Sequence, residues 1–150
     1  MKKMQICFIV VAVAILACPT GWAKEKLTAQ EWFEKGVALQ QQQVFGEAVK
    51  MFTEAINLDD TFAEAYFRRG LSYWSYQKTF ASEALTDFSR AIDRDPKNAE
   101  IYYQRGMLNL FLLSVEATRE DMETAAALGH GEAQKWLDSG RKDKDKEAKA

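Results

Sequence analysis

Residues 63–96 of the 150-residue chain read AEAYFRRGLSYWSYQKTFASEALTDFSRAIDRDP. An aromatic residue, a glycine and a second aromatic residue occur there at helical spacing: Tyr66, Gly70 and Tyr73. A small, a large and a small residue follow at steps of four and three: Ala84, Phe88 and Ala91. Each set falls on one face of a helix. The stretch therefore predicts two helices, joined by a turn between Gln77 and Glu83.

The same pattern occurs on both sides of this stretch. Gly36 lies 34 residues before Gly70 and Gly106 lies 36 residues after it, each directly after a lysine or an arginine. Four residues before each glycine stands a large aromatic residue: Trp32, Tyr66 and Tyr102. The run in the second helix is also repeated, as Ala48, Phe52 and Ala55 in the first unit and as Thr118, Met122 and Ala125 in the third. Repeats of this length predict a stack of helix pairs.

The recurring glycines predict close helix contacts. A glycine inside a helix lowers its stability by about 1 kcal/mol relative to alanine, so its recurrence indicates that a partner helix occupies the space of a side chain. Helix starts are predicted at two capping boxes and at an Asp-Pro pair: Thr28 with Glu31, Thr61 with Glu64, and Asp95 with Pro96.

Together these residues resemble the tetratricopeptide repeat family, whose unit is a 34-residue pair of antiparallel helices. The third unit departs from the family pattern at Asn109, Thr118 and His130. The resemblance implies an all-α fold, a right-handed superhelix of three antiparallel helix pairs with a C-terminal capping helix. The predicted units are residues 29–62, 63–98 and 99–129, followed by a capping helix at 130–140 that ends at Gly140 and a charged, disordered tail at 141–150.

In the family, the first helix of each pair lines a concave groove. Carried onto this sequence, the groove positions that we take as the candidate partner site are Phe33, Val37, Phe67, Leu71, Trp74, Tyr103, Met107 and Phe111, and Gln40 and Leu110 lie at further groove positions. The Lys, Asn and Arg residues with which some family members clamp a terminal carboxylate are missing. We therefore expect an apolar partner, an amphipathic helix or an extended peptide. The alternative for this apolar stripe is internal packing or self-association.

Arginine and aspartate occur together in the second and third units. Arg69 and Arg105 directly precede the repeat glycines, and Asp87 and Asp121 directly precede the large residue of the second helix. The first unit has Met51 in place of the aspartate, and there the basic residue is a lysine. This joint occurrence predicts an ion pair inside each of the two units.

The chain begins with two lysines and an apolar run, residues 6–17, without a charged residue. A run of about 12 residues is too short to span ~30 Å of hydrocarbon as a helix. Gly21 and Ala23 supply the small residues that a signal peptidase reads, and charged residues begin at Lys24. We predict a secretory signal peptide at residues 1–23 and an exported bacterial protein, periplasmic or secreted.

A second processing route stays open. Residues 15–18, ILAC, resemble a bacterial lipobox, which would leave Cys18 lipidated and the protein anchored to the envelope. Leu16 and Pro19 both disfavour lipidation. A third reading of the apolar run is an uncleaved anchor or a buried core helix. Because Cys7 would leave with a signal peptide, we expect no disulfide framework.

Composition and residue inventory disfavour several function classes. Removal of residues 1–23 leaves 22 acidic and 18 basic side chains, a balance that disfavours nucleic acid as a partner. The single histidine, His130, lies between two glycines, where we expect a solvated turn residue. The sequence offers no Cys-His or Ser-His-Asp grouping, zinc-ligand spacing or phosphate-binding glycine loop. We predict no enzymatic activity, metal or cofactor.

The predicted function is a non-catalytic module of the cell envelope that binds another protein, either as a scaffold or as an adaptor. Two alternatives stay open: a self-associating structural envelope component and a pilotin-like lipoprotein. A membrane contact is expected only if Cys18 is lipidated.

Overall fold

The computed structural model describes residues 26–147, and the side chains of residues 26–140. The predicted signal peptide and Cys18 lie outside these residues. The described helices are α1 (Ala29–Gln41), α2 (Phe45–Leu58), α3 (Ala63–Tyr76), the 3₁₀ helix η1 (Lys78–Phe80), α4 (Ala81–Arg94), α5 (Ala99–Phe111), α6 (Val115–Ala127) and α7 (Gly131–Glu147). Over this part of the chain, the structure has no helix of the length and apolar character that crossing a membrane requires.

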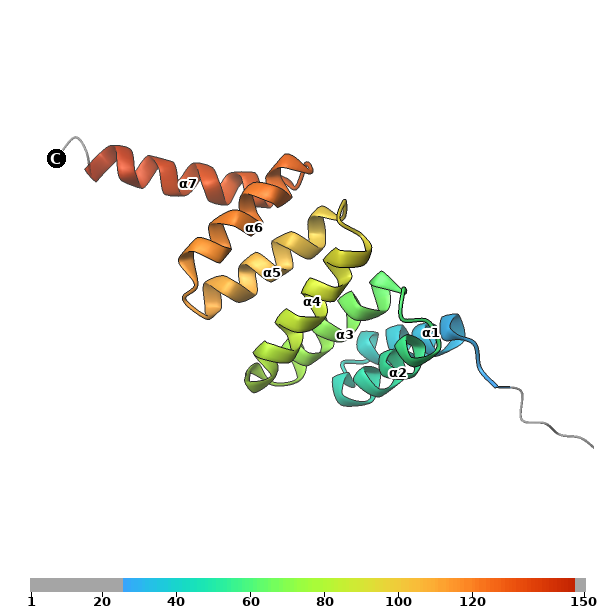
Figure 1. Cartoon of the computed structure of the whole chain (residues 1–150). Coiled ribbons are helices and arrows are strands. Elements are labelled where there is room, and N and C mark those ends of the chain that lie inside the picture. The colour runs from blue at the N-terminus through green and yellow to red at the C-terminus, as the bar shows by residue number, and fades with distance from the viewer. Residues whose placement is uncertain (1–25, 148–150) are drawn as a thin grey trace, which may run out of the picture.

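The helices form three pairs that stack in sequence order. α1 packs on α2, α3 on α4 and α5 on α6; α2 contacts α3, α4 contacts α5, and α7 covers α6. The predicted all-α stack with a terminal helix is thus confirmed. Figure 1 shows the turns within the pairs along one edge of the stack and the connections between pairs along the other. We call these edges, together with the adjoining helix residues Leu58, Phe111 and Val115, the turn edge (residues 42–44, 77–80 and 111–115) and the connection edge (residues 58–62, 95–98 and 128–130).

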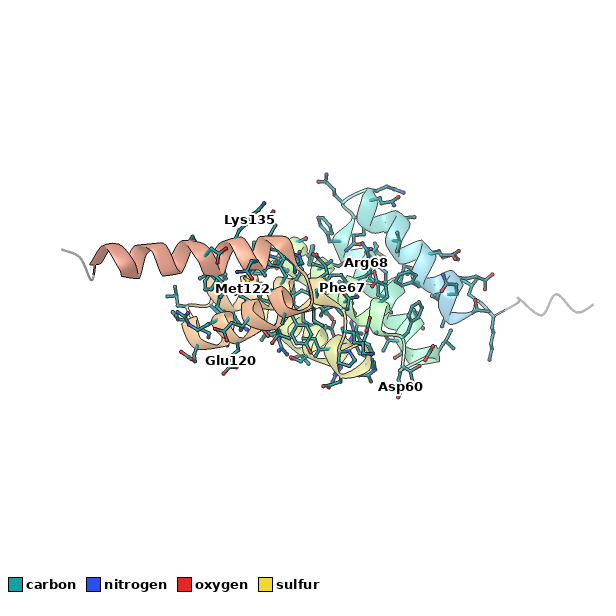
Figure 2. The ribbon with its side chains drawn as sticks, turned by 90° about the horizontal axis from the view of Figure 1, so that it is seen from above. Asp60, Phe67, Arg68, Glu120, Met122 and Lys135 are labelled. Atoms are coloured by element: carbon teal, nitrogen blue, oxygen red, sulfur yellow. The ribbon has the colours of Figure 1, made fainter. Side chains whose placement is uncertain are left out.

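The three repeat glycines lie where helices of a pair come closest, as the sequence predicts. An added Cβ would lie 2.6 Å from the Phe52 ring at Gly36, 2.8 Å from the Phe88 ring at Gly70, and 3.1 Å from the Asp121 Cβ and 3.2 Å from the Met122 methyl at Gly106. The rings of Phe52 and Phe88 and the Met122 side chain are buried. In Figure 2, Phe67 and Met122 lie within the stack, whereas Asp60 and Lys135 lie at its periphery.

The start of α1 is the predicted capping box. Glu31 donates its N–H to the Thr28 hydroxyl at 3.2 Å, and the Glu31 carboxylate accepts the Thr28 N–H at 2.8 Å. Two backbone donors at the helix start are thereby satisfied. Thr28 also donates its hydroxyl to the same carboxylate at 2.9 Å.

The predicted capping box at Thr61 is wrong. Thr61 donates both its hydroxyl and its N–H to the Asp59 carboxylate, at 2.6 and 2.9 Å. Glu64 instead accepts a hydrogen bond from Arg68 at 2.7 Å. The threonine is held in a local turn after α2, because an aspartate two residues earlier competes for it.

The helix start predicted at Asp95 and Pro96 is also wrong, because a neighbouring residue caps the helix instead. Asp95 ends α4, with its N–H donated to the Ala91 carbonyl. Asn98 caps α5 instead, and its side chain accepts the N–H of Glu100 at 3.2 Å. Pro96 therefore lies in the connection rather than in the first turn of the helix.

The turns within the pairs differ in length and chemistry. The two extra residues of the second unit form part of η1, at the predicted place. The other two turns each contain a residue with positive φ, Gln43 at 62° and Leu113 at 60°. These two residues occupy the same place in their units, seven residues after Gly36 and Gly106.

The start of α7 covers the end of the stack. Ala133 is buried with Met122 and Ala125, and Trp136 and Leu137 pack partly buried against them. The terminal pair would otherwise expose this apolar surface to water.

The structure also corrects the predicted end of α7. The helix continues through Gly140 to Glu147, so residues 141–147, predicted to be disordered, are helical in the structure. The stretch is rich in lysine and arginine, which favour helix, and alternates basic with acidic residues. A single glycine does not end a helix when strong helix formers follow it.

Candidate functional site

The predicted groove residues all lie on the first helix of each pair, on α1, α3 and α5. We call them the first-helix face: Phe33, Val37, Phe67, Leu71, Trp74, Tyr103, Met107 and Phe111. Phe67 is only 5% exposed, whereas Met107 and Phe111 are 39% and 54% exposed. The others are half-buried. One part of this face is therefore core and another part is open surface.

Phe33 and Phe67 belong to the core part. The Phe33 ring centroid lies 5.6 Å from that of Phe52 and 4.8 Å from that of Phe62. The Phe67 ring lies 5.8 Å from the Phe88 ring. Tilted rings at such distances attract each other, and truncating a buried ring leaves a cavity. Phe67 thus stabilises the second pair.

The open part lies on α3 and α5. The edge of the Trp74 ring meets Phe111, with centroids 4.7 Å apart at an angle of 72°. The Lys78 ammonium lies 3.4 Å from the Trp74 ring centroid, in a cation–π contact. Met107 lies one helical turn before Phe111, and Leu71 nearly one turn before Trp74. We call Leu71, Trp74, Met107 and Phe111 the apolar patch.

The C-terminal end of α1, which corresponds to the apolar patch on α3 and α5, is polar, and its side chain is hydrogen-bonded to α3. Gln40 donates its side-chain amide to the Ser72 hydroxyl at 3.1 Å and to the Arg68 carbonyl at 3.3 Å. Trp74 occupies the equivalent place in the second unit. The first-helix face is therefore polar toward the end of α1 and apolar across α3 and α5.

His130 is not the solvated turn residue that the sequence suggests. Its side chain is 16% exposed, and its ring stacks on Tyr103 with centroids 4.1 Å apart. Nε2 lies 3.0 Å from the Glu100 carboxylate, and Nδ1 accepts the Ala133 N–H at 3.3 Å. An imidazole with its proton on Nε2 satisfies both contacts. His130 thus caps α7 and ties it to α5.

The predicted ion pair of the second unit is confirmed. Arg69 and Asp87 are 11% and 3% exposed, and Nε and Nη2 of the arginine each donate to one carboxylate oxygen at 2.8 Å. Burial disfavours the charged guanidinium, but the hydrogen bonds and charge of Asp87 outweigh burial and raise the pKa of Arg69. Arg69 also donates to the Thr53 hydroxyl of α2 at 3.1 Å.

The third unit repeats this arrangement. Arg105 donates to Asp121 at 2.7 Å, and to the Ser89 hydroxyl of α4 at 3.1 Å. Asn109 donates to the other oxygen of Asp121 at 3.0 Å. Each arginine therefore joins the two helices of its own pair to the second helix of the preceding pair.

Two small crevices open beside these ion pairs, with volumes of about 200 and 230 Å³. The first is lined by Tyr73, Glu83 and Arg90 besides Arg69 and Asp87, and neither crevice includes the apolar patch. Both are smaller than a typical small-molecule site. Among the residues that the structure describes, His, Cys, Asp and Glu form no group of three placed to hold a metal ion.

The arrangement of the helices is that of known proteins, although no family profile and no curated relative match the sequence. The first TPR domain of Spaghetti (RPAP3), bound to the HSP90 peptide SRMEEVD, superposes with a TM-score of 0.69 at 22% identity, over 75% of this chain and 89% of that one. This chain has the tetratricopeptide repeat fold. The Arabidopsis OM64 TPR domain gives a TM-score of 0.68 at 25% identity, over 75% of this chain and 96% of that one. PcrH, in complex with the chaperone binding region of PopD, gives 0.70 at 18% identity, over 77% and 92%.

Within the tetratricopeptide repeat fold, sequence reasoning missed three features of this chain. It did not identify the contact of Lys78 with Trp74, or the burial of His130. It also passed over the exposed pair Leu112 and Leu113, which are 41% and 85% exposed. Alignment of the units would have found this pair, because the first unit has Gln42 and Gln43 at the same places.

Proposed function

We propose that this chain binds an apolar segment of another protein on its first-helix face, and that it has no catalytic role. The apolar patch carries the proposal. Met107 and Phe111 are exposed, and Phe111 continues across α5 to Trp74 on α3. Contiguous apolar surface of this kind is typical of an interaction site in a soluble domain.

The chemistry of the face supports an apolar partner over an acidic one. Two of the solved neighbours hold polypeptide segments, the HSP90 peptide SRMEEVD in one and the chaperone binding region of PopD in the other. Here, the positions that hold basic and amide clamp residues in some family members carry aromatic and aliphatic side chains instead. Glu100 stands in the first turn of α5 and disfavours an acidic peptide, whereas the charge of Glu64 in α3 is compensated by Arg68. The preferred ligand in this proposal is an amphipathic helix or an extended apolar peptide.

We further propose that binding takes place outside the cytoplasm. The basic start and short apolar run before Lys24 support export. Mass spectrometry of the N-terminus from the native cell tests this. A chain that begins near Lys24, in an extracytoplasmic fraction, is the expected result. A lipid-modified Cys18 would place the protein on a membrane, and an intact Met1 on a chain recovered in the cytoplasmic fraction would contradict export.

Substitutions in the apolar patch test the binding proposal. Trp74→Ser and Phe111→Ser should each weaken a partner complex at least tenfold, because one aromatic side chain loses its buried contact area. Phe67→Ser is unsuitable, since Phe67 is buried and its loss would unfold the second pair. Leu58→Ser is the matched control, because Leu58 is 57% exposed and lies at the connection edge.

The complex is isolated by in-cell crosslinking and identified by mass spectrometry. Equal recovery of the same partner with the unchanged chain, both patch variants and the control would refute the proposal. If the chain is crosslinked only to itself, and light scattering shows an oligomer that the patch variants abolish, the face is a contact between copies.

A further inference from the structure

Lys78 lies at the border of the apolar patch, in the turn that joins α3 to α4. Its ammonium lies 3.4 Å from the centroid of the Trp74 ring and donates to the Trp74 carbonyl at 3.2 Å. Phe111 contacts the same ring from α5. A cation is therefore fixed directly beside the exposed apolar residues of the first-helix face.

The turn that carries this lysine is specific to the second unit. It contains η1 and lies between the turns of the other two pairs along the turn edge (Figure 1). Phe80 anchors η1, because its ring lies 5.6 Å from the ring of Tyr73 and stacks on Tyr76 at 5.9 Å. The other two turns, residues 42–44 and 112–114, contain no charged residue. The second unit thus adds a positioned charge to a fold that the other units form without one.

Three acidic residues lie near the turns, but none of them pairs with Lys78. Glu47, Glu83 and Glu116 stand in the first turns of α2, α4 and α6. Glu47 is paired with Lys50 at 2.7 Å, and Glu83 lines a crevice that does not include the apolar patch. In the part of the chain whose side chains are described, no carboxylate lies within ion-pair distance of the Lys78 ammonium. An acidic group from outside the chain can therefore pair with it.

Binding of an apolar segment changes the surroundings of this cation. A segment that covers Trp74 and Phe111 removes water from the Lys78 ammonium, because the ammonium lies on the same ring. Loss of hydration around a charge is unfavourable unless an opposite charge replaces the water. The ammonium has three N–H donors, of which the Trp74 carbonyl takes one. Because the side chain is already held in place, pairing with a carboxylate costs less side-chain entropy than it would for a freely rotating lysine.

We infer that Lys78 determines the specificity of the first-helix face, by selecting apolar segments in which one aspartate or glutamate adjoins the residues that cover the patch. The inference rests on the proposed function, since it concerns the charge of the same partner. A lysine or arginine of the partner at that place is rejected by repulsion. Glu100 lies toward the connection edge, in the first turn of α5, and disfavours a segment that is acidic throughout.

Selection from a displayed library of random peptides tests the inference without knowledge of the natural partner. Peptides are selected on the immobilised full chain and on the variants Lys78→Met, Lys97→Met and Trp74→Ser. The unchanged chain should select apolar peptides with an acidic residue at one end of the apolar run. Lys78→Met should keep the apolar residues and lose the acidic preference, whereas Lys97→Met, which removes an exposed lysine at the connection edge, should keep both. Trp74→Ser should lose the apolar peptides.

The outcomes separate the inference from the function on which it rests. Apolar peptides without an acidic preference on the unchanged chain would overturn the inference and leave the proposed function intact. An acidic preference that Lys78→Met retains would also overturn it. If the unchanged chain selects no apolar peptides, the proposed function fails, and the inference fails with it.

Affinities of one selected peptide distinguish specificity from a structural role of Lys78. The peptide and a version with its acidic residue changed to the amide are titrated against the unchanged chain, Lys78→Met and Lys78→Arg. The unchanged chain should bind the acidic peptide about fivefold more tightly than the amide version, as a partly exposed ion pair would. Lys78→Met should abolish this ratio, Lys78→Arg should preserve it, and added salt should reduce it. A purely structural role would weaken both peptides alike, so an unchanged ratio in Lys78→Met would overturn the inference.

Discussion

Arg69 and Asp87 form a two-pronged ion pair, with Nε to Oδ2 and Nη2 to Oδ1 both at 2.8 Å. The same guanidinium donates to the Thr53 hydroxyl in the preceding unit. A single arginine therefore fixes the distance between α3 and α4 and the placement of α2 against them. Because the pair is almost fully buried, removal of either partner leaves a charge without compensation.

Arg69→Ala and Asp87→Ala should each lower the free energy of unfolding by about 3 kcal/mol. The double variant should lose clearly less than the sum of the two single losses, because the second change removes a charge that the first left unpaired. Urea unfolding of the four chains gives the coupling energy. Strict additivity would show that the pair contributes nothing beyond its separate side chains.

The same comparison of single and double alanine variants at Arg105 and Asp121 should give a smaller coupling energy. The Arg105 side chain is 25% exposed, against 11% for Arg69. Water therefore solvates more of the charge that is left when one partner is removed. Asn109 also donates to Asp121 and retains part of the carboxylate's hydrogen bonding when Arg105 is removed. A coupling as large as that of the buried pair would contradict this ranking.

The repeat glycines should respond unequally to alanine. Gly36→Ala and Gly70→Ala place a methyl group within 2.6 and 2.8 Å of phenylalanine rings, and each should lower stability by about 2 kcal/mol despite the higher helix propensity of alanine. Gly106→Ala meets the Asp121 Cβ at 3.1 Å and the flexible methyl of Met122 at 3.2 Å. We expect its loss to be below about 1 kcal/mol. Thermal denaturation of the three variants compares them, and equal losses would refute the difference in packing.

The start of α1 should be sensitive to acid. The hydrogen bond from the Thr28 N–H, followed by that from its hydroxyl, lowers the pKa of Glu31 below its ordinary value of 4.5. A lowered folded-state pKa stabilises the cap fully above pH 4.5, and the contribution is lost as the pH falls through the folded-state pKa. The NMR shift of the Thr28 amide should therefore titrate with a midpoint below 4.5, and Thr28→Ala should raise the midpoint of the Glu31 carboxyl. A Thr28 midpoint at or above 4.5 would contradict the capping box.

Removal of the His130 side chain should destabilise the docking of α7 and leave the helix pairs unchanged. His130→Ala removes the acceptor for the Ala133 N–H and the stack on Tyr103, and should destabilise the docking of α7 by about 1–2 kcal/mol. Hydrogen exchange at Ala133 and fluorescence of Trp136 report on α7. His130→Asn keeps a capping acceptor and should recover part of the exchange protection. Unchanged exchange in both variants would mean that Trp136 and Leu137 hold the helix without the cap.

The repeats, the helix pairing and the ion pairs could be predicted from the sequence, because each depends on spacing within one unit. Gly70 lies opposite Phe88, and Gly36 lies opposite Phe52 in the same way. The ion pair of Arg69 with Asp87 recurs as that of Arg105 with Asp121. The failures involve competition between neighbouring residues. Thr61 bonds to Asp59 instead of forming a capping box with Glu64, and Asn98 caps α5 in place of Asp95.

The division of the candidate site into core and open surface was beyond sequence reasoning. Phe33 and Met107 fall on the same periodic stripe, yet the rings of Phe52 and Phe62 pack on Phe33, whereas Met107 stays 39% exposed. Burial of His130 likewise depends on Tyr103 from another helix. Periodicity identifies the face of a helix but not what the next unit places against it.

Site-specific photocrosslinking tests the central claim most directly, by asking what touches the apolar patch in the living cell. A photoreactive residue replaces Met107 on α5 or, as a control, the exposed Glu54 on α2. We expect position 107 to yield one crosslinked polypeptide, identified by mass spectrometry through an apolar segment, with none from position 54 and a loss of the product when Trp74→Ser is added. Equal products from both positions, or a product at 107 that Trp74→Ser leaves unchanged, would contradict a partner site on the first-helix face.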